Sequence, residues 1–194
     1  MRTLVLIRIV HSPSDMGSMR KGLEKESISK VGAEKWKENQ RRIETFWKEV
    51  ENEIYSLNLD LENVRIYQDG LPCGGDLGEK IVKETANKGS QNYQIILKLV
   101  EKGAKLEATE SPELLIKEFE HIKAFINAPS ENEKRDAEIR YDQIKDELLK
   151  ERDIFIAKSI DATLKDDQTG ILFIGAAHDV VSFLEKDIKI KQLD

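Results

Sequence analysis

The chain has 194 residues, of which 35% are charged, 39% hydrophobic and 6% aromatic, and its net charge is −6 at pH 7. That length is sufficient for one domain with a hydrophobic core. Acidic and basic residues are interleaved and no basic stripe carries aromatic residues, which argues against nucleic acid and against an anionic membrane surface as partners.

The N-terminal segment predicts a buried strand. Residues 3–10, TLVLIRIV, are apolar almost throughout and rich in β-branched side chains, as in a strand covered on both faces of a parallel sheet. Residues 11–19 contain the breakers Pro13 and Gly17 and predict a loop. Residues 22–33 are polar and ambiguous.

The next segments predict a long helix, a second strand and a glycine-rich loop. Over residues 33–57 apolar side chains recur at helical spacings; these are Trp36, Ile43, Trp47, Val50 and Ile54. Residues 63–69, NVRIYQD, predict the second strand. The loop GLPCGGDLG follows it at residues 70–78, and helices are predicted over residues 76–86 and 91–102.

The C-terminal half continues the alternation of strand and helix. Its predicted strands are residues 104–110, 171–176 and, as a small fifth strand, 187–193. Gly103 suits the C-terminal cap of the preceding helix, and Ser111 followed by Pro112 suits a helix start. After a break at residues 127–134, one long charged helix is predicted over residues 130–164, and a short helix over residues 179–185.

This order predicts an α/β fold with a mainly parallel sheet of about four to five strands and flanking helices, some of them long and charged. No repeat or linker divides the chain, so residues 1–194 are predicted to form a single α/β domain. The long charged helices could form a projecting pair that serves as a homodimer contact.

Three features bear on the compartment. The apolar N-terminus carries Arg2 and Arg8 and is not followed by a small-residue cleavage site, so it does not read as a signal peptide. No apolar run reaches the length of a spanning helix. The single cysteine, Cys73, excludes a disulfide framework and a cysteine-based zinc site. We therefore expect a cytoplasmic protein.

Polar residues stand at the predicted ends of four strands. His11 ends the first strand, Asp69 the second, the segment 107–110 the third, and His178 lies just beyond Gly175 at the end of the fourth. In an open parallel sheet these ends share the carboxyl edge, where ligands bind.

Each of these residues also has a plain structural interpretation. His11 could be an ordinary loop histidine, and Asp69 with Gly70 is a common turn pair. Glu110 could favour the N-terminus of the next helix through its dipole, and His178 could be a first-turn residue without further role. Two histidines and several acids at the same edge of the sheet together favour a functional site over these structural interpretations. The third histidine, His121, lies mid-helix and is interpreted as a surface residue.

The set His11, Asp69, Glu110 and His178 suits a divalent metal such as Mn, Co, Zn or Fe. A metal there would lower the pKa of a bound water, and a glutamate such as Glu110 could act as general base. Without a metal, His11 or His178 could carry protons.

Arg152 falls on the apolar stripe of the long predicted helix, with Tyr141, Ile144, Leu148 and Phe155. A buried arginine needs an acidic partner or an anionic ligand, unless its head reaches the rim. Arg152 could hold an oxyanion or the substrate, and Asp153 could orient a neighbour.

The glycines of the loop after the second strand offer backbone N–H groups near the same edge. Gly74 and Gly75 are candidate substrate-binding residues there, although a flexible pocket wall is the plainer interpretation. The loop lacks the spacing of a dinucleotide fingerprint. Cys73 in this loop could be reactive or could simply fill space.

Two C-terminal segments resemble a known family. LFIGAAHDV resembles the G-x-x-H motif, and LLKERDIFIAKSI the preceding E-R-D-x-x-x-A segment, of TraB/PrgY and Tiki-like proteins in the EreA/ChaN-like grouping. The resemblance covers about 35 residues and points to Gly175, His178, Glu151, Arg152 and His11. The first strand departs from it, because RIVH lacks the glycine of the family's N-terminal G-x-x-H.

Metal-dependent peptide hydrolysis, esterase activity and haem binding are all associated with this grouping, so the resemblance does not select one chemistry. The residues and the resemblance together favour a metal-dependent hydrolase of a peptide or ester bond. The expected substrate is a small molecule or peptide, the catalytic residues Glu110, Arg152 and His178, and the substrate-binding residues Arg152, Gly175, Gly74 and Gly75. The alternatives are a non-catalytic binding protein for a small anionic or cofactor-like ligand, and a helical scaffold for a protein partner.

Overall fold

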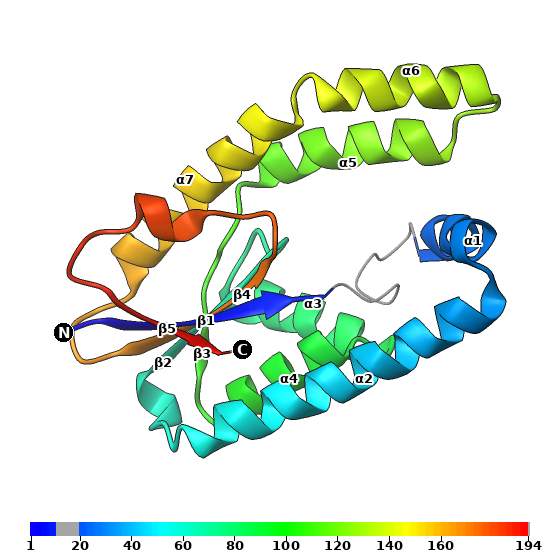
Figure 1. The fold of residues 1–194 in the computed structure, drawn as a ribbon. Helices are drawn as coiled ribbons and strands as arrows, with labels where there is room; N and C mark the ends of the chain where they lie inside the picture. The colour runs from blue at the N-terminus through cyan, green and yellow to red at the C-terminus, as the bar shows by residue number, and fades with distance from the viewer. Residues whose placement is uncertain (11–19, 194) are drawn as a thin grey trace.

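Five parallel strands form one sheet at the centre of the molecule (Figure 1). The computed structural model describes residues 1–10 and 20–193. The order across the sheet is β3-β2-β4-β1-β5. The strands are β1 (Thr3–Ile9), β2 (Val64–Gln68), β3 (Lys105–Leu106), β4 (Thr169–Gly175) and β5 (Lys189–Leu193). The predicted α/β class with a parallel sheet is confirmed.

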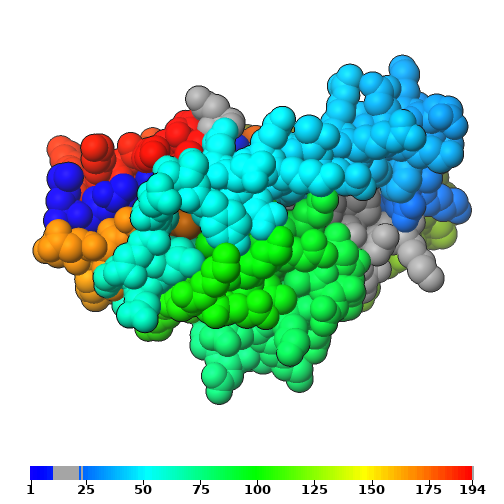
Figure 2. Space-filling view, turned by 90° about the horizontal axis from the view of Figure 1, so that it is seen from below, coloured from blue at the N-terminus to red at the C-terminus, as the bar shows by residue number. Residues whose placement is uncertain are grey.

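Helices cover both faces of the sheet. They are α1 (Arg20–Val31), α2 (Ala33–Ser56), the 3-10 helix η2 (Leu61–Asn63), α3 (Gly75–Asn87), α4 (Gln91–Glu101), α5 (Pro112–Ile126), α6 (Glu131–Asp142), α7 (Lys145–Thr163) and the 3-10 helix η3 (Val180–Phe183). In Figure 1, α2, α3 and α4 lie below the sheet, and α7 and η3 lie above it. Figure 2 shows α2 lying across the lower face beside α3 and α4.

Alternation along the central strands divides the core into two layers. From β1, Val5 and Ile7 point into the layer shared with α2, α3 and α4, where Trp47 is also buried. Leu4 and Leu6 point into the opposite layer, which α7 closes. A continuous apolar strand therefore serves both layers, as expected for a parallel sheet with helices on each side.

The structure corrects two predicted helices. The helix predicted over residues 130–164 is two helices, α6 and α7, separated at Gln143 and Ile144. The break lets α6 lie along α5 in a projecting pair while α7 turns onto the sheet (Figure 1). The short helix predicted over residues 179–185 is only the 3-10 helix η3.

The third strand is also shorter than predicted. Only Lys105 and Leu106 pair with β2, whereas the prediction covered residues 104–110. Beyond Leu106 the backbone N–H groups of Thr109 and Glu110 both donate to the carbonyl of Leu71, at 3.0 and 3.1 Å. The chain therefore leaves the ladder and crosses onto the loop that follows β2, which brings Glu110 towards the centre of the sheet edge.

Candidate functional site

The connections around β2 and β4 create a crevice at the carboxyl edge of the sheet. These strands are neighbours, with Gln68 in register with Phe173. After β2 the chain leaves for α3 on one face, and after β4 it leaves for η3, which packs on α7 on the other face. Such a divergence is the usual ligand-binding position in open α/β sheets.

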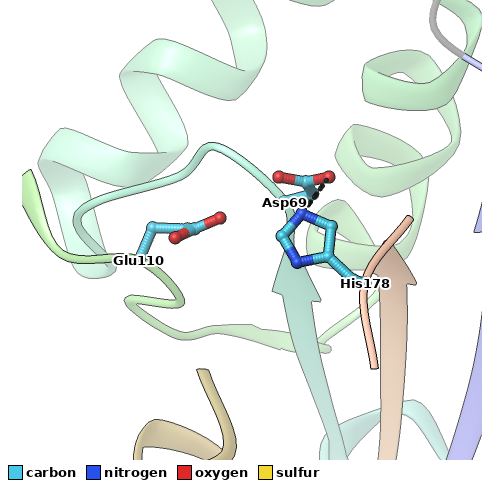
Figure 3. Close-up of side chains that lie close together, drawn as sticks. All are labelled: Asp69, Glu110 and His178. Atoms are coloured by element: carbon cyan, nitrogen blue, oxygen red, sulfur yellow. Dashed lines mark ion pairs between the residues drawn. The ribbon is translucent and has the colours of Figure 1, made fainter. Parts of the chain in front are cut away.

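Three of the predicted site residues meet in this crevice. Asp69 directly follows β2, Glu110 lies on the crossing segment after β3, and His178 follows β4 (Figure 3). Each is buried, and one ligand-capable atom from each lies within 4.8 Å of the others. The fourth predicted metal ligand, His11, lies outside the described residues.

Arg152 of α7 ties the carboxylates together. Its Nη2 donates to Asp69 Oδ1 at 2.8 Å and to Glu110 Oε1 at 2.5 Å, and its Nε donates to Glu110 Oε2 at 3.2 Å. Its Nη1 donates to Glu118 Oε2 of α5 at 2.6 Å. Burial alone would lower the pKa of Arg152, but the hydrogen bond to Glu110 and the surrounding carboxylates outweigh it and raise the pKa. The guanidinium is therefore a fixed positive charge with acids on three sides.

Glu110 is the most deeply enclosed acid of the group. Burial raises the pKa of its carboxyl above the ordinary value, and the nearby Asp69 charge raises it further. The bidentate contact with Arg152 acts in the opposite direction without cancelling these effects. The negatively charged form of Glu110 is therefore less favourable than that of an exposed glutamate.

This raised pKa predicts a pH dependence of stability. A carboxyl with a raised folded-state pKa stabilises the fold below its unfolded-state value, near pH 4.5, and this contribution is lost as the pH rises through the folded-state pKa. Between the unfolded-state and folded-state pKa values of Glu110, we expect the free energy of unfolding of the wild type to fall relative to that of Glu110→Gln. Urea unfolding of both proteins from pH 4 to pH 8 measures the difference, and a relative gain by the wild type would contradict the assignment.

The orientation of His178 is fixed by Asp153. Its Nδ1 lies 2.6 Å from Asp153 Oδ1, and the other oxygen of Asp153 accepts a hydrogen bond from the Asp179 N–H at 2.9 Å. Arg8 Nη1 holds the loop from the other side by donating to the carbonyls of Gly175 and His178, at 3.2 and 2.7 Å. Since an ionised carboxylate only accepts, His178 Nδ1 carries the donated hydrogen.

The second ring nitrogen of His178 faces Asp69. Nε2 lies 3.5 Å from Asp69 Oδ2, which also accepts the Gly175 N–H at 3.0 Å (Figure 3). With its hydrogen on Nδ1, a neutral imidazole presents a lone pair at Nε2. In that tautomer Nε2 and Asp69 Oδ2 are both acceptors, and a cation between them, either a proton or a metal ion, stabilises the arrangement.

The crevice opens into a pocket of about 990 Å³. Asp69, Arg152, Gly175 and His178 form its polar floor, and the α5–α6 pair and the start of α7 form much of its wall. Glu110 is not among the lining residues, because it lies behind Arg152. Glu110 can therefore act on a ligand only through Arg152 or through a shared cation.

Other candidate residues lie away from this floor. Gly74 and Gly75 do not line the pocket. Glu151, indicated by the family resemblance, is exposed. Glu107, the other acid of the third segment, pairs with Arg65 at 2.6 Å. Phe155, placed on the buried stripe by its spacing, is 40% exposed, because the stripe of α7 follows Leu148, Arg152, Ile156 and Ile160.

Gly74 has a packing role that explains its identity. A Cβ added there would lie 2.8 Å from the carbonyl oxygen of Leu106 and 3.0 Å from the N of Ala108. Both contacts are with backbone, which cannot rotate away. Close approach of two chain segments, rather than an anion cradle, accounts for this glycine.

We expect Gly74→Ala to lower the free energy of unfolding by about 1–3 kcal/mol through overpacking. Chemical denaturation measures this loss. The ligand affinity of the folded Gly74→Ala variant should equal that of the wild type. A variant that is as stable as the wild type but does not bind ligand would instead support the predicted role of Gly74 in binding.

Two residues of the pocket were not predicted as site residues from the sequence. Glu118 and Tyr141 both line the pocket, and the Tyr141 hydroxyl donates to Glu118 Oε1 at 3.0 Å. Burial and the Glu118 charge raise the pKa of Tyr141 to about 12, so its hydroxyl stays protonated. The available signal was the position of Glu118 three residues after Leu115 and four before Ile122, an acid on the apolar face of a helix.

Comparison with protein-family models, curated proteins and solved structures found no match for this chain. The resemblance to TraB/PrgY and Tiki-like proteins stays a prediction based on its two C-terminal motifs. Within residues 1–10 and 20–193, no helix has the length and apolar character needed to cross a membrane.

Proposed function

We propose that the protein is a metal-dependent hydrolase of ester or peptide bonds, with Asp69, Glu110 and His178 as metal ligands. The observation that carries the proposal is the face-to-face placement of His178 Nε2 and Asp69 Oδ2 at 3.5 Å, with Asp153 bound to Nδ1 behind the ring. Histidines that bind metals commonly donate their other ring N–H to such a carboxylate.

The donor set fits a divalent ion such as Mn, Co, Zn or Fe. Two carboxylates and one imidazole are ligands that these metals accept. Ligand atoms about 2.0–2.2 Å from one tetrahedral ion lie roughly 3.3–3.6 Å apart, so ligand atoms at the 4.8 Å limit would have to move closer by about 1 Å to share an ion. Glu110 would give up one of its two hydrogen bonds to Arg152 to become a ligand.

The charge balance also favours a cation. Within residues 1–10 and 20–193, Asp69, Glu110, Glu118 and Asp153 surround the guanidinium of Arg152 and the ring of His178. With all four carboxyls ionised and His178 neutral, these four acids exceed the charge of Arg152 by three; the guanidinium of Arg8, which contacts backbone carbonyls of the His178 loop, is the next described cation. Burial makes such an excess costly, and a divalent cation offsets most of it.

For the reaction, the chain supplies orientation and proton acceptors. When bound, a divalent metal polarises a carbonyl and lowers the pKa of a coordinated water. Asp153 and Arg8 fix the His178 loop, and Arg152 fixes Asp69 and Glu110. Glu118, which faces the pocket, is placed to accept the proton of an attacking water.

The experiment is a metal titration of chelator-treated protein by calorimetry, using Mn²⁺, Co²⁺ and Zn²⁺ in turn. We expect about one ion per chain for the wild type, and an affinity lower by a factor of about 100 or more in Asp69→Asn and His178→Ala, since each removes a ligand. His121→Ala is the matched control, because His121 lies on α5 beside Tyr141 and outside the ligand set.

Two outcomes contradict the proposal. One is stoichiometric binding that survives in the Asp69→Asn, His178→Ala double variant. The other is a hydrolytic activity that persists in full after chelation, which would assign the same residues to metal-free acid–base chemistry. A ligand that binds and is recovered unchanged under all metal conditions would instead support a binding protein.

A further inference from the structure

Helix α5 is rich in apolar residues but buries none of them. Among residues 112–126 the large apolar side chains are Leu114, Leu115, Ile116, Phe119, Ile122, Phe125 and Ile126, and no residue of the helix is buried. Ile116 is 57% exposed and Phe119 37% exposed. An apolar helix face normally packs on the core. Helices α6 and α7 contact α5 and leave most of its apolar side chains half-buried, but the described part of the chain leaves Ile116 and Phe119 exposed.

This face lines the pocket already described. Leu115, Ile116, Phe119 and Ile122 form one wall, and Leu149 of α7 also contributes. The same pocket continues to the floor made by Asp69, Arg152 and His178. Its volume of about 990 Å³ falls at the upper end of the range for small-molecule sites, roughly 300–1,000 Å³.

The cations in the described lining are already paired. Lys145 Nζ donates to Asp142 at 2.8 Å, and the guanidinium of Arg152 contacts three carboxylates. An anionic ligand would compete with these acids for the cations, and it would also face Asp69 and Glu118, which line the same pocket. The wall and floor together therefore suit a neutral molecule better than an anion such as a fatty acid.

We infer that the pocket binds a neutral small molecule with an extended apolar part, which packs on the α5 wall while a carbonyl-type polar group reaches the floor. The inference deepens the proposed function, on which it rests for the identity of the bond that is cleaved. It names the substrate class as esters or amides of apolar acyl or alkyl groups, and it assigns Ile116 and Phe119 as specificity-determining residues.

The test uses 2-alkanones of increasing chain length, because they are neutral, carry a carbonyl and cannot be hydrolysed. Their affinities for chelator-treated wild type are measured by calorimetry or ligand-observed NMR. We expect each added methylene to tighten binding by about two- to fourfold until the pocket is filled, as burial of apolar surface predicts.

The Ile116→Ser, Phe119→Ser variant should lose this chain-length dependence. Ile139→Ser is the matched control, since Ile139 lies on neighbouring α6, is 48% exposed and is not a lining residue. Affinities independent of chain length in the wild type, or an unchanged dependence in the double variant, would overturn the inference. So would a wild-type dimer in sedimentation that the double variant disrupts, because the face would then be an interface between copies.

This result is separable from the metal proposal. The alkanone series is measured without metal, so a failed metal titration leaves its outcome intact. Conversely, a flat alkanone series leaves the metal titration and its Asp69→Asn and His178→Ala variants unaffected.

Discussion

Replacing Arg152 with methionine is expected to lower the free energy of unfolding by about 3–5 kcal/mol, the range for removing one partner from a buried ionic network. Methionine keeps an unbranched stem about as far as the Nε of arginine, but it removes the only guanidinium that contacts Asp69, Glu110 and Glu118 within the described residues. Arg152 is 5% exposed, so water cannot replace its hydrogen bonds. Three acids would then lie together without their counter-charge.

Urea unfolding at pH 7 measures this loss, with Arg42→Met as the matched control. Arg42 makes one exposed ion pair with Glu38 four residues earlier, worth about 0.3–0.5 kcal/mol. Adding Glu110→Gln to Arg152→Met should recover part of the lost stability, because one of the orphaned charges is removed. A loss no larger than that of Arg42→Met would mean that Arg152 does not hold the acids together.

The second large effect is expected in turnover. With a neutral ester of the class inferred above, His178→Ala should lower kcat/KM by a factor of roughly 10²–10⁴, in line with the loss of a positioned catalytic group. Asp153→Asn should cost less, about 10- to 100-fold, because the ring remains but its orienting carboxylate is lost. His121→Ala should match the wild type.

Protein stability separates these variants from simple unfolding. Circular dichroism and thermal unfolding should show both variants folded at the assay temperature. Equal activities of His178→Ala and wild type would remove His178 from the mechanism. A loss in Asp153→Asn as large as in His178→Ala would instead mean that the carboxylate itself contacts the reacting groups.

The central strands could be predicted from the sequence because burial on both faces leaves a continuous apolar run. TLVLIRI and TGILFIG, the sequences of β1 and β4, have this character.

The predicted third strand is too long because the backbone of Thr109 and Glu110 bonds to Leu71 in the loop after β2, a long-range contact that local propensity does not encode. The break between α6 and α7 has no proline or glycine at Gln143 or Ile144, and it follows from the different partners of the two helices.

The edge of the sheet where Asp69, Glu110 and His178 meet could also be predicted, since parallel strands end on one side. The ion pairs that these residues form could not be predicted. Arg152 contacts acids that lie 34, 42 and 83 positions away, and the choice of Glu110 over Glu107 depends on the crossing of the chain after Leu106. The two C-terminal motifs contain Arg152, Asp153 and His178, but neither motif indicates Glu118, which accepts a hydrogen bond from Arg152.

The most direct test of the metal site is anomalous diffraction from crystals of the chelator-treated protein soaked in Mn²⁺ and recorded at two wavelengths. The metal-ligand assignment predicts one anomalous peak within bonding distance, about 2.0–2.3 Å, of a carboxylate oxygen of Asp69, a carboxylate oxygen of Glu110 and Nε2 of His178. An anomalous peak elsewhere, or a site without metal in which Arg152 keeps both bonds to Glu110, would contradict it.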